Sequence, residues 1–236
     1  MTNKNIPIYI QIHDQIREEI EKGKWAVGDR LPSERELALA FNVSRMTLRQ
    51  AVQTLADEGI LERRIGSGTY VAREKVQERM TGTTSFSEIM LEQGKKPSSK
   101  TVSYFVTTPS SSEMEKLNLA ADEPIVRMER IRYADGLPIC FEVASIPARL
   151  VEEYPKKAIT DSLYQTLTKD GQHSIGKAEQ KVTAVVASER IAELLEIKKG
   201  EPILRVKQIS FLSEGEAFEY VRSQYVGSRF EFFLER

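Results

Sequence analysis

Two capped helices and a hairpin turn follow one another near the start of the chain, and their spacing leaves few folds open. Ser33 and Glu36 form the residue pair that caps a helix start, and the helix that follows should run to about Phe41. Ser44 then caps a further helix that continues to about Glu58, where a glycine ends it. The segment therefore predicts two short helices joined by a tight turn.

An amphipathic helix precedes these two helices, and a hairpin follows them. Between residues 7 and 22 isoleucine recurs at every fourth position, which places the isoleucines on one helix face. Residues 59–73, GILERRIGSGTYVAR, form two short alternating runs around a Gly-Ser-Gly turn, which predicts a β-hairpin. Three helices and a hairpin in this order are the plan of a winged helix-turn-helix, whose third helix enters the major groove of DNA.

The residue types on the third expected helix suit the reading of bases. Arg45 and Thr47 lie at its start, where helix side chains meet base edges, and Arg49 lies one turn further on the same face as Arg45. An arginine fork can bind both acceptors of a guanine, whereas Arg35 on the preceding helix is better placed to bind a phosphate. An arginine at any one of these positions is more often a solvated surface residue, so the prediction depends on all of these residues occurring together.

The ungapped stretch LPSERELALAFNVSRMTLRQAVQTLADEGILERRIGSGTYVA resembles the winged-helix signature of GntR-type bacterial transcription regulators, and the similarity spans about Pro7 to Arg73. The resemblance implies that the chain contacts DNA through the residues that match the family's contacts, which are Arg35, Arg45, Thr47, Arg49 and Gly66. With the helix cap and the hairpin turn included, the candidate DNA-binding residues are Arg35, Ser44, Arg45, Thr47, Arg49, Gly66 and Ser67.

The chain is long enough to hold a second domain. Its 236 residues exceed the size of a typical single domain, which is about 150 residues. We expect the winged helix-turn-helix to cover residues 1–73 and a polar linker without a core-facing pattern to cover residues 74–82. A second domain should cover residues 83–236.

Strand-like runs alternate with short helical runs in the expected second domain, which indicates an α+β fold with a mainly antiparallel sheet. The Asp-Gly pair at 135–136 and the Glu-Gly pair at 214–215 each separate two strand-like runs and predict hairpin turns. Residues 117–146 and 195–224 share a helix end, a Glu-Pro-Ile strand start, a hairpin turn and a Phe-Glu pair. The domain is therefore expected to contain two related halves.

This second region resembles the UTRA domain of the HutC subfamily of GntR-type regulators, which shares its fold with chorismate lyase. The similarity is carried by TTSFSEIM, ERIRYADGLPICFEVASIP, SLYQTL and FEYVRSQYVGSRFEF, and it departs from the family within YVGSRF, where an Asp is usual. The resemblance implies a domain that binds a small-molecule effector and a repressor that the effector releases from DNA. Effectors in the family include sugar phosphates, urocanate-like acids and fatty acids.

Two arginines on one expected strand point to an anionic ligand. Arg130 and Arg132 project from the same face of that strand, about 7 Å apart. Two charges on an otherwise apolar face need a counter-charge. Gln208 and Ser210 occupy the equivalent positions of the second half, so the fold itself does not require arginines there. This asymmetry favours a ligand.

Other polar residues complete a candidate site for a phosphorylated sugar or an amino sugar. Ser162 and Ser87 lie at expected helix starts, whose free N–H groups favour anions, and Glu142 and Glu219 lie at matching places in the two halves, where they could bind hydroxyl groups. An internal salt bridge between the arginines and these glutamates is the alternative. With three aromatic residues of the motifs quoted above, the candidate effector-binding residues are Phe86, Ser87, Arg130, Arg132, Glu142, Ser162, Tyr164, Glu219 and Tyr225.

Composition argues against several other classes of protein. The net charge is −1, whereas architectural DNA-binding proteins usually carry a strong positive excess. His13 and His173 are the only histidines; His13 lies in the first helix of the expected DNA-binding domain, and His173 lies in an expected loop with no recognisable nucleophile or metal partner nearby, so a lyase-like enzyme is a remote alternative. Cys140 is the only cysteine, which excludes an internal disulfide and a cysteine zinc site. We expect no cofactor and no metal.

The remaining expectations concern location and partners. No run approaches the roughly 18 apolar residues of a membrane span, and the start MTNKNIPIYIQIHD does not resemble a secretory signal, so we expect a cytoplasmic protein. One recognition helix covers too few base pairs to select a site, so we expect a homodimer on an inverted-repeat DNA operator. The expected effector is a sugar phosphate, and a non-sugar organic acid remains the alternative.

Overall fold

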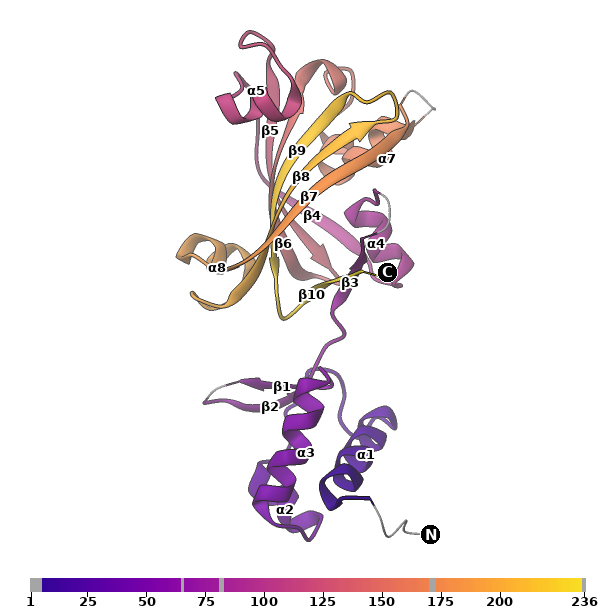
Figure 1. Ribbon diagram of the computed structural model, residues 1–236, viewed down its shortest axis with the longest axis vertical. Helices are drawn as coiled ribbons and strands as arrows, with labels where there is room; N and C mark the ends of the chain where they lie inside the picture. Colours follow the sequence, from indigo (N-terminus) through magenta and orange to yellow (C-terminus); the bar gives the residue numbers. More distant parts are fainter. Residues whose placement is uncertain (1–5, 65, 81–82, 170–172, 235–236) are drawn as a thin grey trace. The chain divides into compact units, whose positions relative to one another are not determined.

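The computed structural model describes residues 6–64, 66–80, 83–169 and 173–234, and the chain divides into two compact units (Figure 1). The first unit covers Met1–Glu74, the second covers Lys75–Arg236, and each has its own hydrophobic core. Among the described residues, no helix is long and apolar enough to cross a membrane.

The first unit has the predicted order of three helices and a hairpin. Its elements are α1 (Ile8–Glu21), α2 (Glu34–Ala40), α3 (Arg45–Asp57), β1 (Leu61–Arg64) and β2 (Gly68–Val71). Ser33 and Glu36 form a reciprocal capping box on α2, and the Ser44 hydroxyl accepts a hydrogen bond from the Thr47 amide at 3.1 Å. Because β1 and β2 pair antiparallel, the winged helix-turn-helix prediction is confirmed.

The core of the first unit fixes which face of α3 remains exposed. Ile16 of α1 and both Leu48 and Leu55 of α3 are completely buried. Burying a side chain of this size stabilises the fold by about 1.5–3 kcal/mol. The opposite face of α3 carries Arg45 and Arg49, which are exposed.

A six-stranded antiparallel sheet forms the centre of the second unit, with the strand order β4-β5-β6-β9-β8-β7. The strands are β4 (Pro97–Thr107), β5 (Ile125–Ala134), β6 (Leu137–Pro147), β7 (Ile175–Val186), β8 (Pro202–Leu212) and β9 (Ala217–Val226). The α+β prediction with a mainly antiparallel sheet is confirmed. Asp135 and Gly136 both have positive φ in the turn between β5 and β6, as a two-residue hairpin requires.

The strand order also confirms the two related halves. One half runs β4, α5 (Ser111–Leu117), β5, β6, and the other runs β7, α8 (Glu189–Leu195), β8, β9. The halves meet where β6 pairs with β9, and in Figure 1 α5 and α8 lie at opposite ends of the sheet. Both helices end at a residue in the left-handed conformation, Asn118 and Glu196.

Short helices cover one face of this sheet and leave a polar gap between them. α6 (Lys156–Asp161) and α7 (Leu163–Thr168), which follow the 3-10 turn Ala148–Leu150, pack on β5, β6 and β9 through a core that includes Met128 and Phe218. α4 (Phe86–Glu92) packs through Met90 in a separate core that includes Ile139. α4 and α7 lie on the same side of the sheet in Figure 1, and both helices contribute residues to one pocket.

The linker expected over residues 74–82 is in part a strand. β3 (Val76–Arg79) pairs in parallel with β10 (Phe230–Phe233) at the far end of the chain, and both Val76 and Phe230 are buried. Four residues are too few to show an alternating pattern, and the pairing partner lies more than 150 positions away, so local sequence reasoning missed it. Residues 81–82 of the expected linker lie outside the described residues.

Candidate functional site

The start of α3 presents the candidate DNA-reading side chains. Arg45 is exposed, as is Arg35 near the start of α2. The Ser44 hydroxyl lies 2.8 Å from the Thr47 hydroxyl, so these two candidate residues are joined to each other through the helix cap. The cap therefore fixes the end of α3 from which Arg45 projects.

Arg49 is held by a neighbouring carboxylate. Its Nε donates to Glu34 at 3.0 Å, and the other oxygen of Glu34 accepts from Arg63 of β1 at 2.7 Å. Glu34 thus connects α2, α3 and the wing hairpin. Because all three side chains are at least partly exposed, the energetic worth of these pairs is small and their main effect is orientation.

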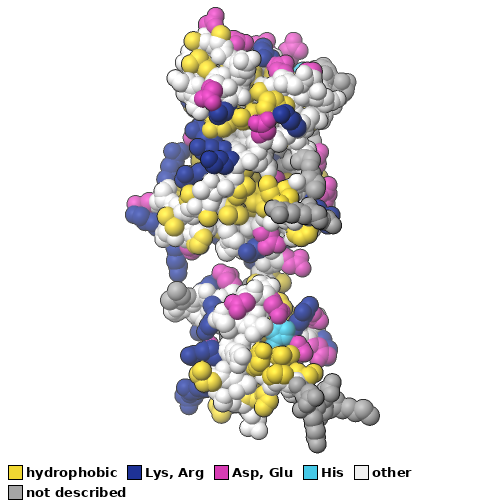
Figure 2. All heavy atoms as spheres, in the orientation of Figure 1, with side chains coloured by type: hydrophobic (Ala, Val, Ile, Leu, Met, Phe, Trp, Pro, Cys, Tyr) yellow, Lys and Arg dark blue, Asp and Glu magenta, His cyan; other side chains and the backbone are white. Residues whose placement is uncertain are grey.

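A groove between the start of α2 and the hairpin gathers further arginines. Sequence reasoning assigned Arg35 here but missed Arg30, Arg63 and Arg64, because single arginines in a connection or a short strand give no periodic signal. Lys and Arg side chains gather along the left edge of this unit in Figure 2, the side toward which the hairpin projects in Figure 1. The arrangement of these arginine and lysine side chains therefore creates a positively charged surface, although the net charge of the chain is −1.

The glycines of the hairpin turn have different roles. Gly66 has a φ of +75°, and open space surrounds the position of a Cβ there, so its exposed backbone can approach a partner. Gly68 has a φ of +135°, a backbone conformation that other residues rarely adopt, so the conformation of the turn favours glycine there; a Cβ would also lie 2.8 Å from Nε of Arg30, a side chain that would have to move. The Ser67 hydroxyl is hydrogen-bonded to the Tyr70 hydroxyl at 2.7 Å.

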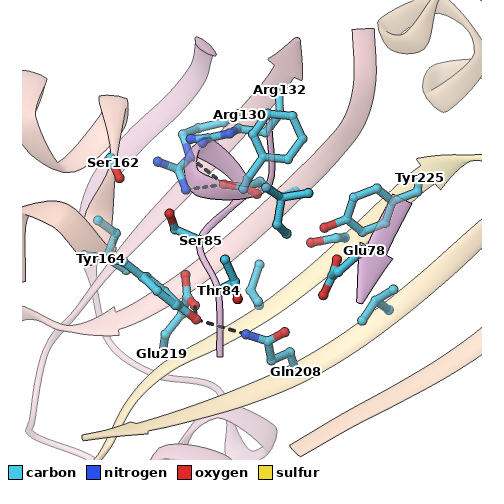
Figure 3. A pocket seen from close by; sticks show the side chains of 17 residues that line it. Glu78, Thr84, Ser85, Arg130, Arg132, Ser162, Tyr164, Gln208, Glu219 and Tyr225 are labelled. Atoms are coloured by element: carbon cyan, nitrogen blue, oxygen red, sulfur yellow. Dashed lines mark hydrogen bonds and ion pairs between the residues drawn. The ribbon is translucent and has the colours of Figure 1, made fainter. Parts of the chain in front are cut away.

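The second unit contains a pocket in the polar gap between α4, α7 and the sheet (Figure 3). Eight of the nine candidate effector residues line it, and the ninth, Ser87, is hydrogen-bonded to one of them. The residues lining the pocket are Glu78, Thr84, Ser85, Phe86, Ile89, Arg130, Arg132, Glu142, Ser162, Leu163, Tyr164, Val206, Gln208, Glu219, Val221, Ser223 and Tyr225.

Arg130 is neutralised within the protein. Its Nε donates to the Glu142 carboxylate at 2.6 Å, and its Nη1 donates to the carbonyl oxygens of Ile159 and Thr160 in α6. The side chains of Arg130 and Glu142 are both more than nine-tenths buried. The internal salt bridge that the sequence left open is therefore present for this arginine.

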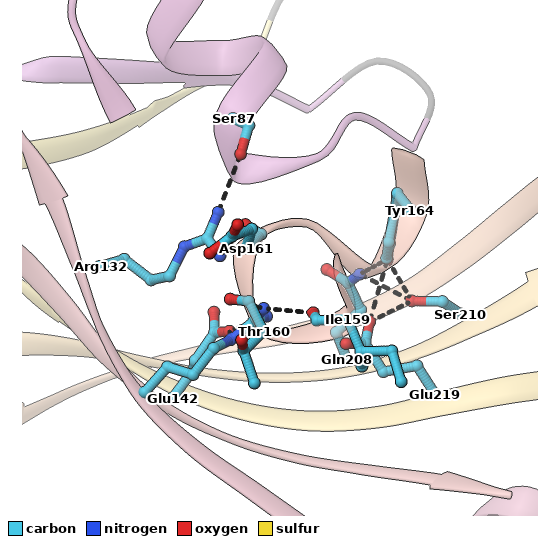
Figure 4. A network of polar contacts seen from close by, with 11 residues as sticks. Ser87, Arg132, Glu142, Ile159, Thr160, Asp161, Tyr164, Gln208, Ser210 and Glu219 are labelled. Atoms are coloured by element: carbon cyan, nitrogen blue, oxygen red, sulfur yellow. Dashed lines mark hydrogen bonds and ion pairs between the residues drawn. The ribbon is translucent and has the colours of Figure 1, made fainter. Parts of the chain in front are cut away.

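Arg132 has a different environment. It donates to the Ser87 hydroxyl at 3.1 Å and to the Asp161 carbonyl at 3.2 Å (Figure 4). Its Cζ atom also lies 4.6 Å from the centre of the Phe86 ring. Its buried Nε has no hydrogen-bond partner, and no ion pair joins it to a carboxylate of the described residues. Burial and the charge of the neighbouring Arg130 lower the pKa of Arg132 against the opposing charge of Glu142.

A hydrogen-bonded network lines the other side of the pocket. The Tyr164 hydroxyl lies 2.7 Å from the Ser210 hydroxyl, donates to Glu219 at 3.1 Å, and accepts from Gln208 at 3.0 Å (Figure 4). Burial and the charge of Glu142 raise the pKa of Glu219 to about 7 against the opposing effect of its hydrogen bonds. At neutral pH this carboxyl can therefore accept or donate hydrogen bonds.

The structure adds pocket residues that sequence reasoning missed. Ser85, not Ser87, caps α4: its hydroxyl accepts from the Glu88 amide, and the Glu88 carboxylate accepts from the Ser85 amide. Ser162 lies between α6 and α7, where it ends one helix and starts the next. The missed polar residues are Glu78, Thr84, Ser85, Gln208 and Ser223. For Gln208 and Ser223 the available signal was the alternation of side chains along β8 and β9, which puts both residues on the face that carries Glu219; no such signal exists for Glu78, Thr84 and Ser85.

The described residues give no support to a metal centre. They contain no group of three or more His, Cys, Asp or Glu side chains that could hold an ion. Cys140 is completely buried. His13 lies in the first unit, where it contacts Asp14 and Glu58, and it is not among the residues that line the pocket.

The chain matches two known families along most of its length. Residues 8–71 match the family described as bacterial regulatory proteins, gntR family, and residues 92–231 match the UTRA domain. The HTH-type transcriptional repressor NagR of Bacillus subtilis strain 168 is 35% identical over 96% of this chain and 93% of NagR. The mannosyl-D-glycerate transport/metabolism system repressor MngR of Escherichia coli strain K12 is 31% identical over 97% of this chain and 95% of MngR.

Solved structures agree with this match. PhnF from Mycobacterium smegmatis superposes with a TM-score of 0.68 at 27% identity and covers 95% of this chain and 98% of PhnF. A GntR-family transcriptional regulator from Enterococcus faecalis V583 is 62% identical with a TM-score of 0.56, and the similarity covers 59% of this chain and all of that chain. The predicted DNA-binding regulator is therefore confirmed, and the chain belongs to the GntR family of bacterial transcription regulators, with a UTRA domain as its second unit.

Proposed function

We propose that this regulator is a cytoplasmic repressor that binds an inverted-repeat operator as a homodimer and leaves it when a phosphorylated sugar binds the UTRA pocket. The observation that carries the proposal is Arg132. A buried guanidinium without a carboxylate partner is costly unless a ligand supplies the missing negative charge. Arg130 does not need such a ligand, because Glu142 already neutralises it.

Phosphate matches the donors that this part of the pocket offers. Arg132 can present two parallel N–H groups to an oxyanion, Ser87 lies beside it with a hydroxyl group, and Ser162 adds a further hydroxyl to the lining of the pocket. A charge-assisted hydrogen bond of this kind contributes about 1.5–3 kcal/mol. Because α4 and α7 are short, we assign the anion to these side chains and not to the helix starts.

The other side of the pocket suits the hydroxyl groups of a sugar. Glu219 and Tyr164 offer both donors and acceptors there, and Tyr225 adds a further hydroxyl. Several similar proteins are named for carbohydrate derivatives: MngR for mannosyl-D-glycerate, and a probable repressor of Shigella flexneri for fructoselysine utilisation. These names favour a sugar derivative over a non-sugar organic acid.

The first unit would read the operator through α3. Arg45 and Arg49 lie on its exposed face, and Arg49 would exchange its hydrogen bond to Glu34 for a base or phosphate. The wing would approach the backbone through Gly66 and Ser67. Two such units related by a two-fold axis would double the number of base pairs read, which is the reason for proposing a homodimer and an inverted repeat.

The pocket must widen to admit such a ligand. Its volume is about 70 Å³, whereas pockets for small molecules typically measure about 300–1,000 Å³. Thr84, Ser85 and Phe86 form one wall, and they lie in the segment that enters the UTRA domain from the DNA-binding unit. If a bound effector displaces this wall, the displacement would act on the segment that leads to the DNA-binding unit and would change the orientation of that unit.

Two measurements on the full-length chain test the proposal. Arg45→Ala and Arg49→Ala should each weaken operator binding by about 1–3 kcal/mol, while Arg17→Ala, which removes an exposed arginine of α1, should not. A thermal-shift screen of sugar phosphates and organic acids should then identify a sugar phosphate that also releases operator DNA. Unchanged operator affinity in both α3 variants would contradict the assignment of α3 as the DNA-reading helix. Release of operator DNA by an organic acid and by no sugar phosphate would contradict the proposed class of effector.

A further inference from the structure

Glu78 is a pocket residue for which the proposed function gives no role. It lies on β3, opposite Phe232 of β10 in the strand register, and its side chain is partly buried. In Figure 3 its carboxyl group lies beside Tyr225, on the side of the pocket away from Tyr164. It is therefore placed to contact a different part of an effector from the part that Glu219 contacts.

The three carboxyl groups of the pocket differ in how their charge is compensated. Glu142 forms an ion pair with Arg130, and the charge of the same arginine lowers the pKa of Glu219. Glu78 has no such help: burial raises its pKa to about 7, and the opposing contribution comes from a hydrogen bond that Gln180 donates at 3.3 Å. Of the described pocket carboxyls, Glu78 is thus the one that the arginines leave uncompensated.

The hydrogen bond from Gln180 is a weak substitute for a cation. The same amide nitrogen also lies 2.6 Å from the Gln208 side-chain oxygen, a much shorter contact than the one to Glu78. The charged form of a carboxyl group that is partly removed from water and accepts only one long hydrogen bond is strongly stabilised by a positively charged hydrogen-bond donor. The pocket therefore has an unpaired cation at Arg132 and an unpaired acid at Glu78.

We propose that Glu78 binds a primary ammonium group of the effector and so makes the pocket select an amino sugar phosphate over the corresponding hydroxyl sugar. This inference rests on the proposed function, since it assumes that Arg132 holds the phosphate. A ligand with a phosphate at one end and an ammonium group at the other matches the two unpaired charges. Glu78 is a specificity-determining residue in this arrangement.

The position of Glu78 in the chain links this contact to regulation. It lies seven residues after Val71, the last residue of the wing strand β2, and β3 is the first element of the UTRA domain. An effector that attracts Glu78 therefore acts on the segment through which the chain leaves the DNA-binding unit. Selection of the ammonium group and transmission of the signal would then depend on the same side chain.

The test compares two probes that differ in one group, glucosamine 6-phosphate and glucose 6-phosphate, by calorimetry on the full-length chain. Wild-type protein should bind the amino sugar at least about tenfold more tightly, the equivalent of one charge-assisted hydrogen bond. Glu78→Gln should remove this preference and leave the affinity for glucose 6-phosphate within about twofold. Because the pKa of Glu78 is about 7, its neutral form is present near neutral pH, and glutamine resembles that form. The variant should therefore fold normally, which thermal unfolding can check.

Glu231→Gln is the matched control. Glu231 lies on β10 in the same small sheet, opposite Gln77, and does not line the pocket. This variant should keep the preference for the amino sugar. Equal binding of the two probes by wild-type protein, a preference that survives in Glu78→Gln, or its loss in Glu231→Gln would each overturn the role of Glu78 and leave the sugar-phosphate function standing. Wild-type protein that binds neither probe would overturn the proposed function, and this inference with it.

Discussion

Arg130 and Glu142 lie opposite one another on adjacent strands, β5 and β6, and form a buried ion pair. Arg130 is also bound to two carbonyl oxygens of α6, so the pair holds that helix against the sheet. Arg132 projects from the same strand face but is joined to Ser87 and a carbonyl. Two arginines that look equivalent in sequence therefore differ in their contacts: a carboxylate neutralises Arg130 inside the protein, whereas Arg132 has no such partner, and this is why we propose that it binds the effector.

Replacement of each arginine should separate these roles. Arg130→Ala should lower the free energy of unfolding by about 3–5 kcal/mol, because it leaves Glu142 buried without its counter-charge. Arg130→Met combined with Glu142→Leu should recover most of this loss, since the uncompensated charge is gone. Urea unfolding followed by circular dichroism measures both. An Arg130→Ala variant as stable as the wild type would show that the pair contributes nothing to the fold.

Glu113 should make the UTRA domain sensitive to acid. Burial favours its neutral form, but hydrogen bonds from Arg127, Ser110 and Ser145 outweigh burial and lower the pKa to about 2. Its contribution to stability is therefore complete above the unfolded pKa of about 4.5 and is lost as pH falls toward 2. Glu113→Gln should cost about 3 kcal/mol near neutral pH and progressively less below pH 4.5.

An exposed glutamate of the same helix provides the control for Glu113. Glu115 pairs only with the exposed Lys116 among the described residues, so Glu115→Gln should change the free energy of unfolding by less than about 1 kcal/mol. Urea titrations of both variants between pH 3 and pH 7 make the comparison. A pH-independent difference between Glu113→Gln and wild type would contradict the assignment.

His13 should give the DNA-binding unit the opposite pH dependence. Burial disfavours its charged form, but the hydrogen bonds that the charged ring donates to the Asp14 and Glu58 carboxylates, together with the charges of these carboxylates, outweigh burial and raise the pKa of His13. The stabilisation is complete below the unfolded pKa of about 6.5 and is lost as pH rises through the higher folded value. Trp25, the single tryptophan of the chain, reports unfolding of this unit by fluorescence. His13→Gln should remove the loss of stability that follows as pH rises above about 6.5, and His173→Gln should not.

Local signals in the sequence were sufficient to predict the helices and the hairpin of the first unit. Ser33 and Ser44 are caps whose effect is confined to one helical turn, and the isoleucine spacing of α1 defines its buried face. The contact of Arg49 with Glu34 was not predictable, because it depends on the angle at which α2 and α3 cross. No periodicity encodes that angle.

In the UTRA domain the arginine pair and the glutamates could be found, but their pairing could not. Arg130 meets Glu142 because of the β5–β6 register, and a shift of the register would have joined different partners. Glu78 was assigned to a linker, since the strand that holds it exists only through its pairing with β10. The residues that sequence reasoning missed are thus those positioned by contacts between distant segments.

The last prediction concerns coupling between the two units. If an effector at Arg132 releases the operator, thermodynamic linkage requires the operator to weaken the effector by the same factor, typically about 5- to 150-fold. Calorimetry with the sugar phosphate that best stabilises the chain should show this factor between free protein and the operator complex. Arg132→Ala should bind operator with wild-type affinity and no longer release it, because in our proposal the side chain contacts the effector, and it is not part of the ion pair that holds α6. Equal effector affinities in the two wild-type titrations would mean that the ligand occupies the pocket without acting as an inducer.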